Sequence, residues 1–332
     1  MTTSREVPPA PARRANLTQV PLFTGPLPPV DPDTPLWPGR VATGGGGELY
    51  VREVAGPETE TAVYVHGLGG SSTNWTDLAG LLATRMQGFI VDLPGFGRSE
   101  PPRGFPYTLE AHAGVVTRFI EELGHGPVHL FGNSMGGAIS MLVAAGRPDL
   151  VRTLTLVSPA VPDLRPSPWR ISDPRLPLAY LPLLGRPARR ALAAMPPRQR
   201  AEQMIRLVFA HPEEVPPQRL RAAEEEVTER LTMPWAGDAL GRSTVGLVRS
   251  WLARRPRSLW TVARRIEAPT LVVWGTQDRL VSVRKAPRTA ELIRRGRLLV
   301  LPRTGHVAQM ERPESVARAV LGMLDAVARE RW

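Results

Sequence analysis

Gly132-Asn133-Ser134-Met135-Gly136 joins a predicted strand to a predicted helix, and this stretch decides the fold. The apolar run Val128–Phe131 before it is typical of a buried parallel strand, and the small apolar residues of Gly137–Ala145 indicate a helix. A serine in so tight a turn has a strained backbone, and the two flanking glycines leave room for the neighbouring strand and helix. The pattern predicts a nucleophile beside the free N–H groups of a helix N-terminus. An incidental serine in a glycine-rich turn is the alternative.

Two polar residues follow predicted strands later in the chain. Asp278 comes after the strand Thr270–Trp274, and His306 comes after the strand Arg297–Leu301. Since ligand sites of open parallel sheets form at the carboxyl ends of the strands, we expect Ser134, Asp278 and His306 at one edge of the sheet. The chain order Ser, Asp, His is that of hydrolases with a nucleophile on such a turn.

A glycine-rich loop, His66–Gly70, follows the predicted strand Ala62–Val65. It is placed to offer a backbone N–H to an oxyanion.

With these segments the chain resembles the α/β-hydrolase family, in its serine-nucleophile branch with a helical cap. The matching segments occur in the family's order: His66–Gly70, Asp92–Ser99, Gly132–Gly137, Gly275–Asp278 and Thr304–His306. They span about residues 40 to 330. The resemblance implies an α/β fold with a mostly parallel central sheet flanked by helices and a helical cap insertion.

The resemblance also implies a role for each site residue. Ser134 is the nucleophile, His306 the base and Asp278 the acid that orients the base, and the backbone amides of Leu68 and Met135 form the oxyanion hole. Family members with an aspartate nucleophile are dehalogenases and epoxide hydrolases, so Ser134 argues against both activities.

Three regions are expected along the chain. Residues 1–38 form a proline-rich N-terminal arm, residues 39–158 and 267–332 the hydrolase core, and residues 159–266 the helical cap. In the expected cap, residues 159–266, the strand pattern disappears, and a structureless loop of that length would be unusual. Its candidate helices are Pro187–Met195, Arg198–Ala210, Gln218–Leu231 and Asp238–Leu252.

The favoured activity is cleavage of carboxylic esters with an apolar acyl group through an acyl-serine intermediate, because the cap region is rich in apolar residues. Hydrolysis of a carbon–carbon bond in ring-cleavage products is the alternative within enzymes, although the loop His66–Gly70 lacks the proline of those relatives. A non-catalytic ligand-binding or scaffold protein is the alternative of another class.

Two carboxylate positions leave choices open. Asp163 follows the predicted strand Val151–Val157 and competes with Asp278 as the acid of the triad. Glu224–Glu226 could hold a substrate amine, as an aminopeptidase requires, but a charge run on a helix surface is the favoured interpretation.

The six histidines show no metal-binding spacing. His129 is expected to be packed and hydrogen-bonded in a core strand, and His66 to shape the oxyanion loop. His112 and His211 are interpreted as surface or capping residues.

Composition limits the remaining possibilities. The chain of 332 residues has no cysteine, which excludes disulfides, thiol nucleophiles and Cys-ligated metals. We expect no metal, no nucleotide or other cofactor, and a small-molecule ester as the partner. There is no apolar run long enough to span a membrane and no signal peptide at the N-terminus, so a cytoplasmic location is expected. The sequence does not indicate the oligomeric state.

The chain is strongly basic, with a formal net charge of +11. From Ala160 to Arg265 there are 19 Arg against 10 Asp and Glu. An anionic membrane surface or nucleic acid would suit such a charge. A solvated arginine-rich surface is favoured here and nucleic-acid binding is not expected, because no nucleic-acid motif is present and acidic residues are interleaved.

Overall fold

A computed structural model describes residues 19–31, 33, 35–164 and 194–332. Its centre is an eight-stranded sheet in the order β1-β2-β4-β3-β5-β6-β7-β8. The strands are β1 (Gly39–Gly44), β2 (Gly47–Val54), β3 (Thr61–Val65), β4 (Gln87–Val91), β5 (Val128–Asn133), β6 (Val151–Val157), β7 (Thr270–Gly275) and β8 (Gly296–Leu301). β2 pairs antiparallel with β1 and β4, and all other pairs are parallel. The expected mostly parallel α/β sheet is confirmed.

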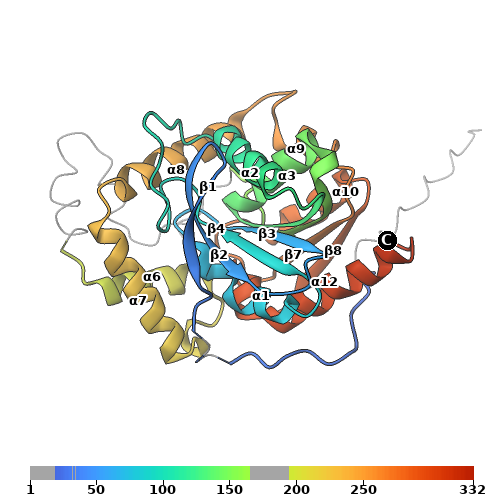
Figure 1. Cartoon of the computed structure of the whole chain (residues 1–332), viewed down its shortest axis with the longest axis horizontal. Helices are drawn as coiled ribbons and strands as arrows, with labels where there is room; N and C mark the ends of the chain where they lie inside the picture. Colours follow the sequence, from blue (N-terminus) through green and yellow to red (C-terminus); the bar gives the residue numbers. More distant parts are fainter. Residues whose placement is uncertain (1–18, 32, 34, 165–193) are drawn as a thin grey trace, which may run out of the picture.

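Helices cover both faces of this sheet (Figure 1). One face packs against α2 (Leu109–Leu123), α3 (Met135–Gly146), α9 (Leu259–Ala263) and α10 (Ala286–Leu292). The other packs against α1 (Thr76–Leu82), α11 (Ala308–Glu311) and α12 (Pro313–Ala328). Burial on both sides explains why β3, β5 and β7 are near-continuous apolar runs rather than alternating ones.

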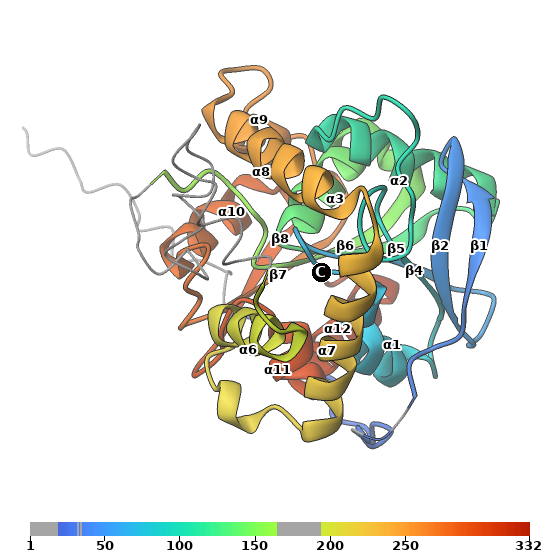
Figure 2. The ribbon, with the colours of Figure 1, turned by 90° about the vertical axis from the view of Figure 1, so that its left-hand side faces the viewer.

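Between β6 and β7 the chain is helical over residues 197–252, as the sequence predicted. The helices are α6 (Pro197–Val208), α7 (Pro217–Thr232) and α8 (Ala236–Leu252). In Figure 2, α8 lies in the upper part of the view, and α6 and α7 lie in the lower part. Most of the candidate helix Pro187–Met195 lies outside the described residues, as do the apolar residues Leu176, Tyr180, Leu181 and Leu184 of the expected cap region.

The predicted elements of the core match the structure closely. The strand Val151–Val157 has the expected bounds. β1 and β2 form a hairpin that turns at Gly44–Gly47. Short 3-10 helices punctuate the loops at η2 (Ser72–Trp75), η3 (Pro148–Leu150), η5 (Pro212–Glu214) and η6 (Val283–Lys285). No helix in the described ranges has the length and apolarity that a bilayer crossing requires.

The described part of the N-terminal segment runs in an extended form along α12. The Phe23 backbone N–H donates to the Arg318 carbonyl at 2.9 Å, and the Arg318 guanidinium donates to the Phe23 and Gly25 carbonyls at 3.0 Å each. Trp37 packs against the hydrophobic core on the sheet face that α1, α11 and α12 cover, and it donates its indole N–H to the Thr76 carbonyl. Aromatic anchors and backbone hydrogen bonds therefore fix this segment to the core.

Two histidines of the core have different surroundings. His129 is buried in β5 and bonds to the hydroxyl of Thr153 at 2.8 Å and a carboxylate oxygen of Glu60 at 2.9 Å, as expected for a packed core histidine. His112 was interpreted as a surface or capping residue, and this is wrong, since the capping side chain of α2 is that of Thr108. It is fully buried on α2, with its ring 4.9 Å from that of Phe105 and 6.1 Å from that of Phe96.

The buried His112 ring has no hydrogen-bond partner for either nitrogen among the described residues. Burial, with a smaller contribution from nearby His66, lowers the pKa of His112 to about 3. Below a pH of about 6.5 the unfolded chain takes up a proton at this position, while the folded protein does not until about pH 3. The stability contributed by neutral His112 is therefore complete above pH 6.5 and is lost as the pH falls through this window.

We expect His112→Phe, which retains an aromatic ring in this cluster, to weaken the acid sensitivity of the fold. The loss of unfolding free energy between pH 7.5 and pH 5.5 should be smaller in the variant by roughly 1.4 kcal/mol. This is the free energy by which protonation of His112 stabilises the unfolded state at a pH one unit below the ordinary histidine pKa, while the folded state takes up no proton there. Urea unfolding at both pH values measures this difference. Equal losses in the two proteins would show that His112 is not neutral in the folded state.

Candidate active site

Ser134 lies in a strained turn between β5 and α3. Its φ of 54° and ψ of −119° place a non-glycine residue at positive φ. A Cβ at Gly132 would lie 2.5 Å from the Gly136 carbonyl oxygen, and one at Gly136 would lie 2.3 Å from the Val65 carbonyl oxygen. Glycine is required at both positions because β5, α3 and β3 approach so closely.

Asp278 and His306 are in direct contact. The Nδ1 atom of His306 lies 2.9 Å from Oδ2 of Asp278, and the exposed fractions of the two side chains are 3% and 0%. The other carboxylate oxygen accepts the Leu280 and Val281 backbone N–H groups, both at 2.9 Å. Since a carboxylate only accepts hydrogen bonds, the neutral form of the His306 imidazole carries its proton on Nδ1 and presents a lone pair on Nε2.

The Nε2 atom of His306 is buried and has no partner within the described part of the chain. Asn133 brings the histidine loop to the serine turn, because its side-chain amide donates to the carbonyls of both Val157, at 3.0 Å, and His306, at 3.2 Å. The residue next to Ser134 thus fixes the backbone of His306.

The loop after β3 lies beside the serine. A Cβ at Gly67 would be 3.0 Å from the Cβ of Ser134. Buried His66 shapes this loop, since its Nδ1 donates to the Gly67 carbonyl at 2.7 Å and its Nε2 accepts the Leu93 backbone N–H at 3.0 Å. Burial lowers the pKa of His66, which keeps the ring neutral in this role.

The backbone amides of Leu68 and Met135 have no protein acceptor among the residues that the structure describes. The Met135 amide is at the first position of α3, where helical N–H groups lack intrahelical partners. Both amides belong to the segments that flank Ser134.

Asp163 has other partners. Its carboxylate is fully buried, accepts the Ser282 backbone N–H at 3.1 Å and lies 3.7 Å from the Lys285 ammonium. The competing acid of the sequence prediction therefore lies against the segment before α10, while Asp278 contacts the histidine.

Glu226 is also engaged, because it accepts the Thr73 hydroxyl at 2.7 Å and forms an ion pair with Arg230. Its charge is compensated, which does not favour its use as an anchor for a substrate amine.

The sequence prediction did not include the end of α6 as part of the site. The His306 backbone N–H donates to the Val208 carbonyl at 2.7 Å, and the Arg279 guanidinium donates to the carbonyls of Arg206 and Phe209. The insertion thus bonds to the loops that hold both Asp278 and His306.

Glu311 strengthens this connection. Its two carboxylate oxygens accept the backbone N–H groups of Gly305, at 2.7 Å, and Ala210, at 2.9 Å. Burial raises the pKa of Glu311, and the two hydrogen bonds oppose that rise. The carboxylate therefore bridges the histidine loop and the insertion. An acidic residue five positions after His306 was the only available signal.

With this geometry established, comparison with known proteins defines the family. Residues 63–313 match the model of the alpha/beta hydrolase fold family. The chain belongs to this family.

Among its relatives is the uncharacterized hydrolase YugF of Bacillus subtilis (strain 168), which is 25% identical over 85% of this chain and 96% of its own length. A 2-hydroxy-6-oxononadienedioate/2-hydroxy-6-oxononatrienedioate hydrolase of Cupriavidus pinatubonensis is 28% identical over 81% of this chain and 88% of its own. A crystal structure of a membrane phospholipase A has 27% identity and a TM-score of 0.69, and the match covers 88% of this chain and 86% of that one.

The bridge at Glu311 generates a prediction about stability. Glu311→Gln should lower the unfolding free energy by about 2 kcal/mol, because the amide nitrogen that replaces one oxygen leaves a backbone N–H unpaired. It should also speed hydrogen exchange at the Gly305 and Ala210 amides. Glu314→Gln is the matched control, since Glu314 is exposed in the first turn of α12. If both variants unfold alike and exchange is unchanged, the bridge contributes no stability.

Proposed function

We propose that this protein is a serine hydrolase that cleaves carboxylic esters with an apolar acyl group. The observation that carries the proposal is the buried His306 side chain, which is held by Asp278 through Nδ1 and presents an unpartnered Nε2. Its backbone is fixed by the neighbour of Ser134. A base, its orienting acid and a strained serine are the parts that acyl transfer requires.

In this mechanism Nε2 of neutral His306 accepts the Ser134 hydroxyl proton as Oγ attacks the carbonyl carbon of the ester. Asp278 holds the imidazole tautomer and stabilises the imidazolium that forms. The amides of Leu68 and Met135 donate to the tetrahedral oxyanion, and such a donor typically contributes about 2.7–4 kcal/mol. His306 then protonates the alcohol that leaves, and water hydrolyses the acyl-serine by the same steps.

The preference for an apolar acyl group is supported by a residue of the insertion that lies next to the loop His66–Gly70. A Cβ at Gly69 would lie 3.5 Å from Cδ1 of Leu240 on α8, so an aliphatic side chain lies next to this loop. Leu240 is also one of the exposed large apolar residues and can therefore contact a substrate. Burial of apolar substrate surface against such residues would stabilise the complex.

Hydrolysis of a carbon–carbon bond is the second candidate. It is favoured by the relative from Cupriavidus pinatubonensis, which is a 2-hydroxy-6-oxononadienedioate/2-hydroxy-6-oxononatrienedioate hydrolase. The proline-free loop His66–Gly70 does not favour it. A non-catalytic binding protein is the third reading, and the engaged Asp278–His306 pair does not favour it.

We expect the parent protein to hydrolyse p-nitrophenyl esters and Ser134→Ala to lose this activity while keeping its thermal unfolding transition, because the variant lacks the attacking hydroxyl. The panel comprises acetate to dodecanoate esters, a dienone ring-cleavage product and an aminoacyl anilide. Faster turnover of the dienone than of the esters would favour the carbon–carbon bond hydrolase. If the protein turned over none of these compounds, the result would favour the non-catalytic binding protein. Residual esterase activity in Ser134→Ala within tenfold of the parent would reject Ser134 as the nucleophile.

Asp278 and Asp163 allow a matched test of which aspartate orients His306. Asp278→Asn should lower ester turnover by up to about 10⁴-fold, the effect of the same change in a protease triad, because the amide favours the wrong histidine tautomer. Asp163→Asn removes a carboxylate that is equally buried but lies against Ser282 and Lys285, and should keep turnover within about tenfold of the parent. Steady-state kinetics of both folded variants measure the effect. The reverse ranking would transfer the role to Asp163.

A further inference from the structure

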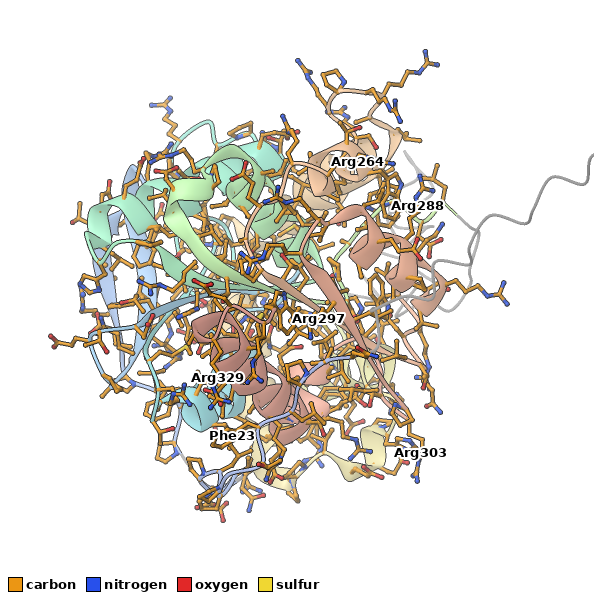
Figure 3. All side chains as sticks on the ribbon, turned by 90° about the vertical axis from the view of Figure 1, so that its right-hand side faces the viewer. Phe23, Arg264, Arg288, Arg297, Arg303 and Arg329 are labelled. Atoms are coloured by element: carbon orange, nitrogen blue, oxygen red, sulfur yellow. The ribbon has the colours of Figure 1, made fainter. Side chains whose placement is uncertain are left out.

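Positive charge is concentrated on one side of the molecule. Residues 249–297 carry 13 Arg and Lys against three Asp and Glu, while the whole chain has a net charge of +11. They include the end of α8, the loop to α9, α9 itself, η6 and α10. α9 contacts α10, and Arg288 of α10 lies over the ring of Trp260 in α9 at 4.4 Å. Figure 3 shows Arg264 and Arg288 near each other on this side.

Ten arginines of this region form what we call the basic surface: Arg249, Arg254, Arg255, Arg257, Arg264, Arg265, Arg284, Arg288, Arg294 and Arg295. All are exposed except Arg295, which is half-buried. None has an ion pair with an acidic side chain in the part of the chain that the structure describes. Their charge is therefore uncompensated.

Several arginines outside the basic surface are paired. Arg98 lies 2.7 Å from Glu229, and Arg85 lies 2.9 Å from Asp325. Acidic residues thus pair with several arginines elsewhere in the protein, while the ten arginines of the basic surface have no such pairs within the part of the chain that the structure describes.

Apolar side chains adjoin the basic surface on α8. Val245, Val248 and Leu252 are exposed by 48%, 42% and 61%. Their spacing of three and four residues places them on one side of the helix. The opposite side is buried through Ala239, Ser243 and Leu247. α8 therefore presents an apolar strip to solvent directly before the arginines of the following loop.

We propose that the basic surface and the apolar strip of α8 together dock on an anionic lipid bilayer. Guanidinium groups pair with lipid phosphates in a bidentate manner, and the apolar strip enters the boundary between headgroups and acyl chains. Nucleic acid would satisfy the charge but offers no comparable apolar layer to the exposed valines and leucine. The docking does not depend on ester hydrolysis and stands whether or not the proposed function is correct.

Cosedimentation with vesicles tests the proposal. All proteins carry Ser134→Ala, so that lipid esters are not cleaved during the measurement. Binding is expected to vesicles of phosphatidylcholine with 25% phosphatidylglycerol and not to pure phosphatidylcholine, and to weaken with added salt. The triple variant Arg254→Gln/Arg255→Gln/Arg257→Gln should bind roughly 100-fold more weakly, from about 1 kcal/mol for each basic residue near an anionic surface.

A matched control removes the same charge elsewhere. Arg103→Gln/Arg221→Gln/Arg329→Gln changes three exposed arginines outside the basic surface and should stay within threefold of the parent. Val248→Ser/Leu252→Ser keeps every charge and should still bind at least fivefold more weakly. Circular dichroism and thermal unfolding verify that all variants are folded.

Three outcomes would overturn the proposal. The first is equal weakening by the two triple variants, which would reflect net charge alone. The second is parental vesicle binding by Val248→Ser/Leu252→Ser, which would remove the apolar contribution. The third is binding to a 20-base-pair DNA duplex that is tighter than binding to the anionic vesicles, which would identify nucleic acid as the partner.

Discussion

The close approach of β3, β5 and α3 at Ser134 is the constraint on which the rest of the site depends. The positive φ of Ser134 turns the chain from strand to helix within one residue, and the carbonyls of Val65 and Gly136 leave no space for a side chain at the flanking glycines. The N-terminus of α3 directly follows the serine, and Gly67 of the loop after β3 lies beside it. Asn133 then extends the constraint to the histidine loop through its side-chain amide. The backbone of the core thus sets the relative positions of the loops before any substrate contact is made.

Much of this arrangement could be predicted because it follows from short-range patterns. The apolar runs of β4, β6 and β7 and the glycines around Ser134 are local signals, and parallel strands bring their carboxyl ends together whatever the loops contain. Asp278 and His306 were placed at one edge by this argument, and the structure brings their side chains into contact.

What the sequence did not reveal depends on contacts between distant segments. The position of His112 on α2 is compatible with either face of a helix end, and its burial results from packing against Phe96 and Phe105 of a preceding irregular loop. Glu311 bonds to Ala210, which is 101 residues away in the chain. Neither contact has a periodicity or motif that could indicate it. The pairing of surface arginines is likewise a matter of which acidic side chains lie within reach, and composition alone does not contain that information.

The bonds from the end of α6 to the loops of Asp278 and His306 have a consequence for how such proteins can be recombined. An insertion that made no bonds to the loops of the core would be exchangeable as a unit. Here the Val208 carbonyl and the Ala210 amide are part of the support of the histidine loop. A chimera that replaces the insertion and discards these backbone positions would remove two supports of the loop that carries His306. The natural crossover point for such an exchange therefore lies after Ala210, so that the donor segment begins beyond α6.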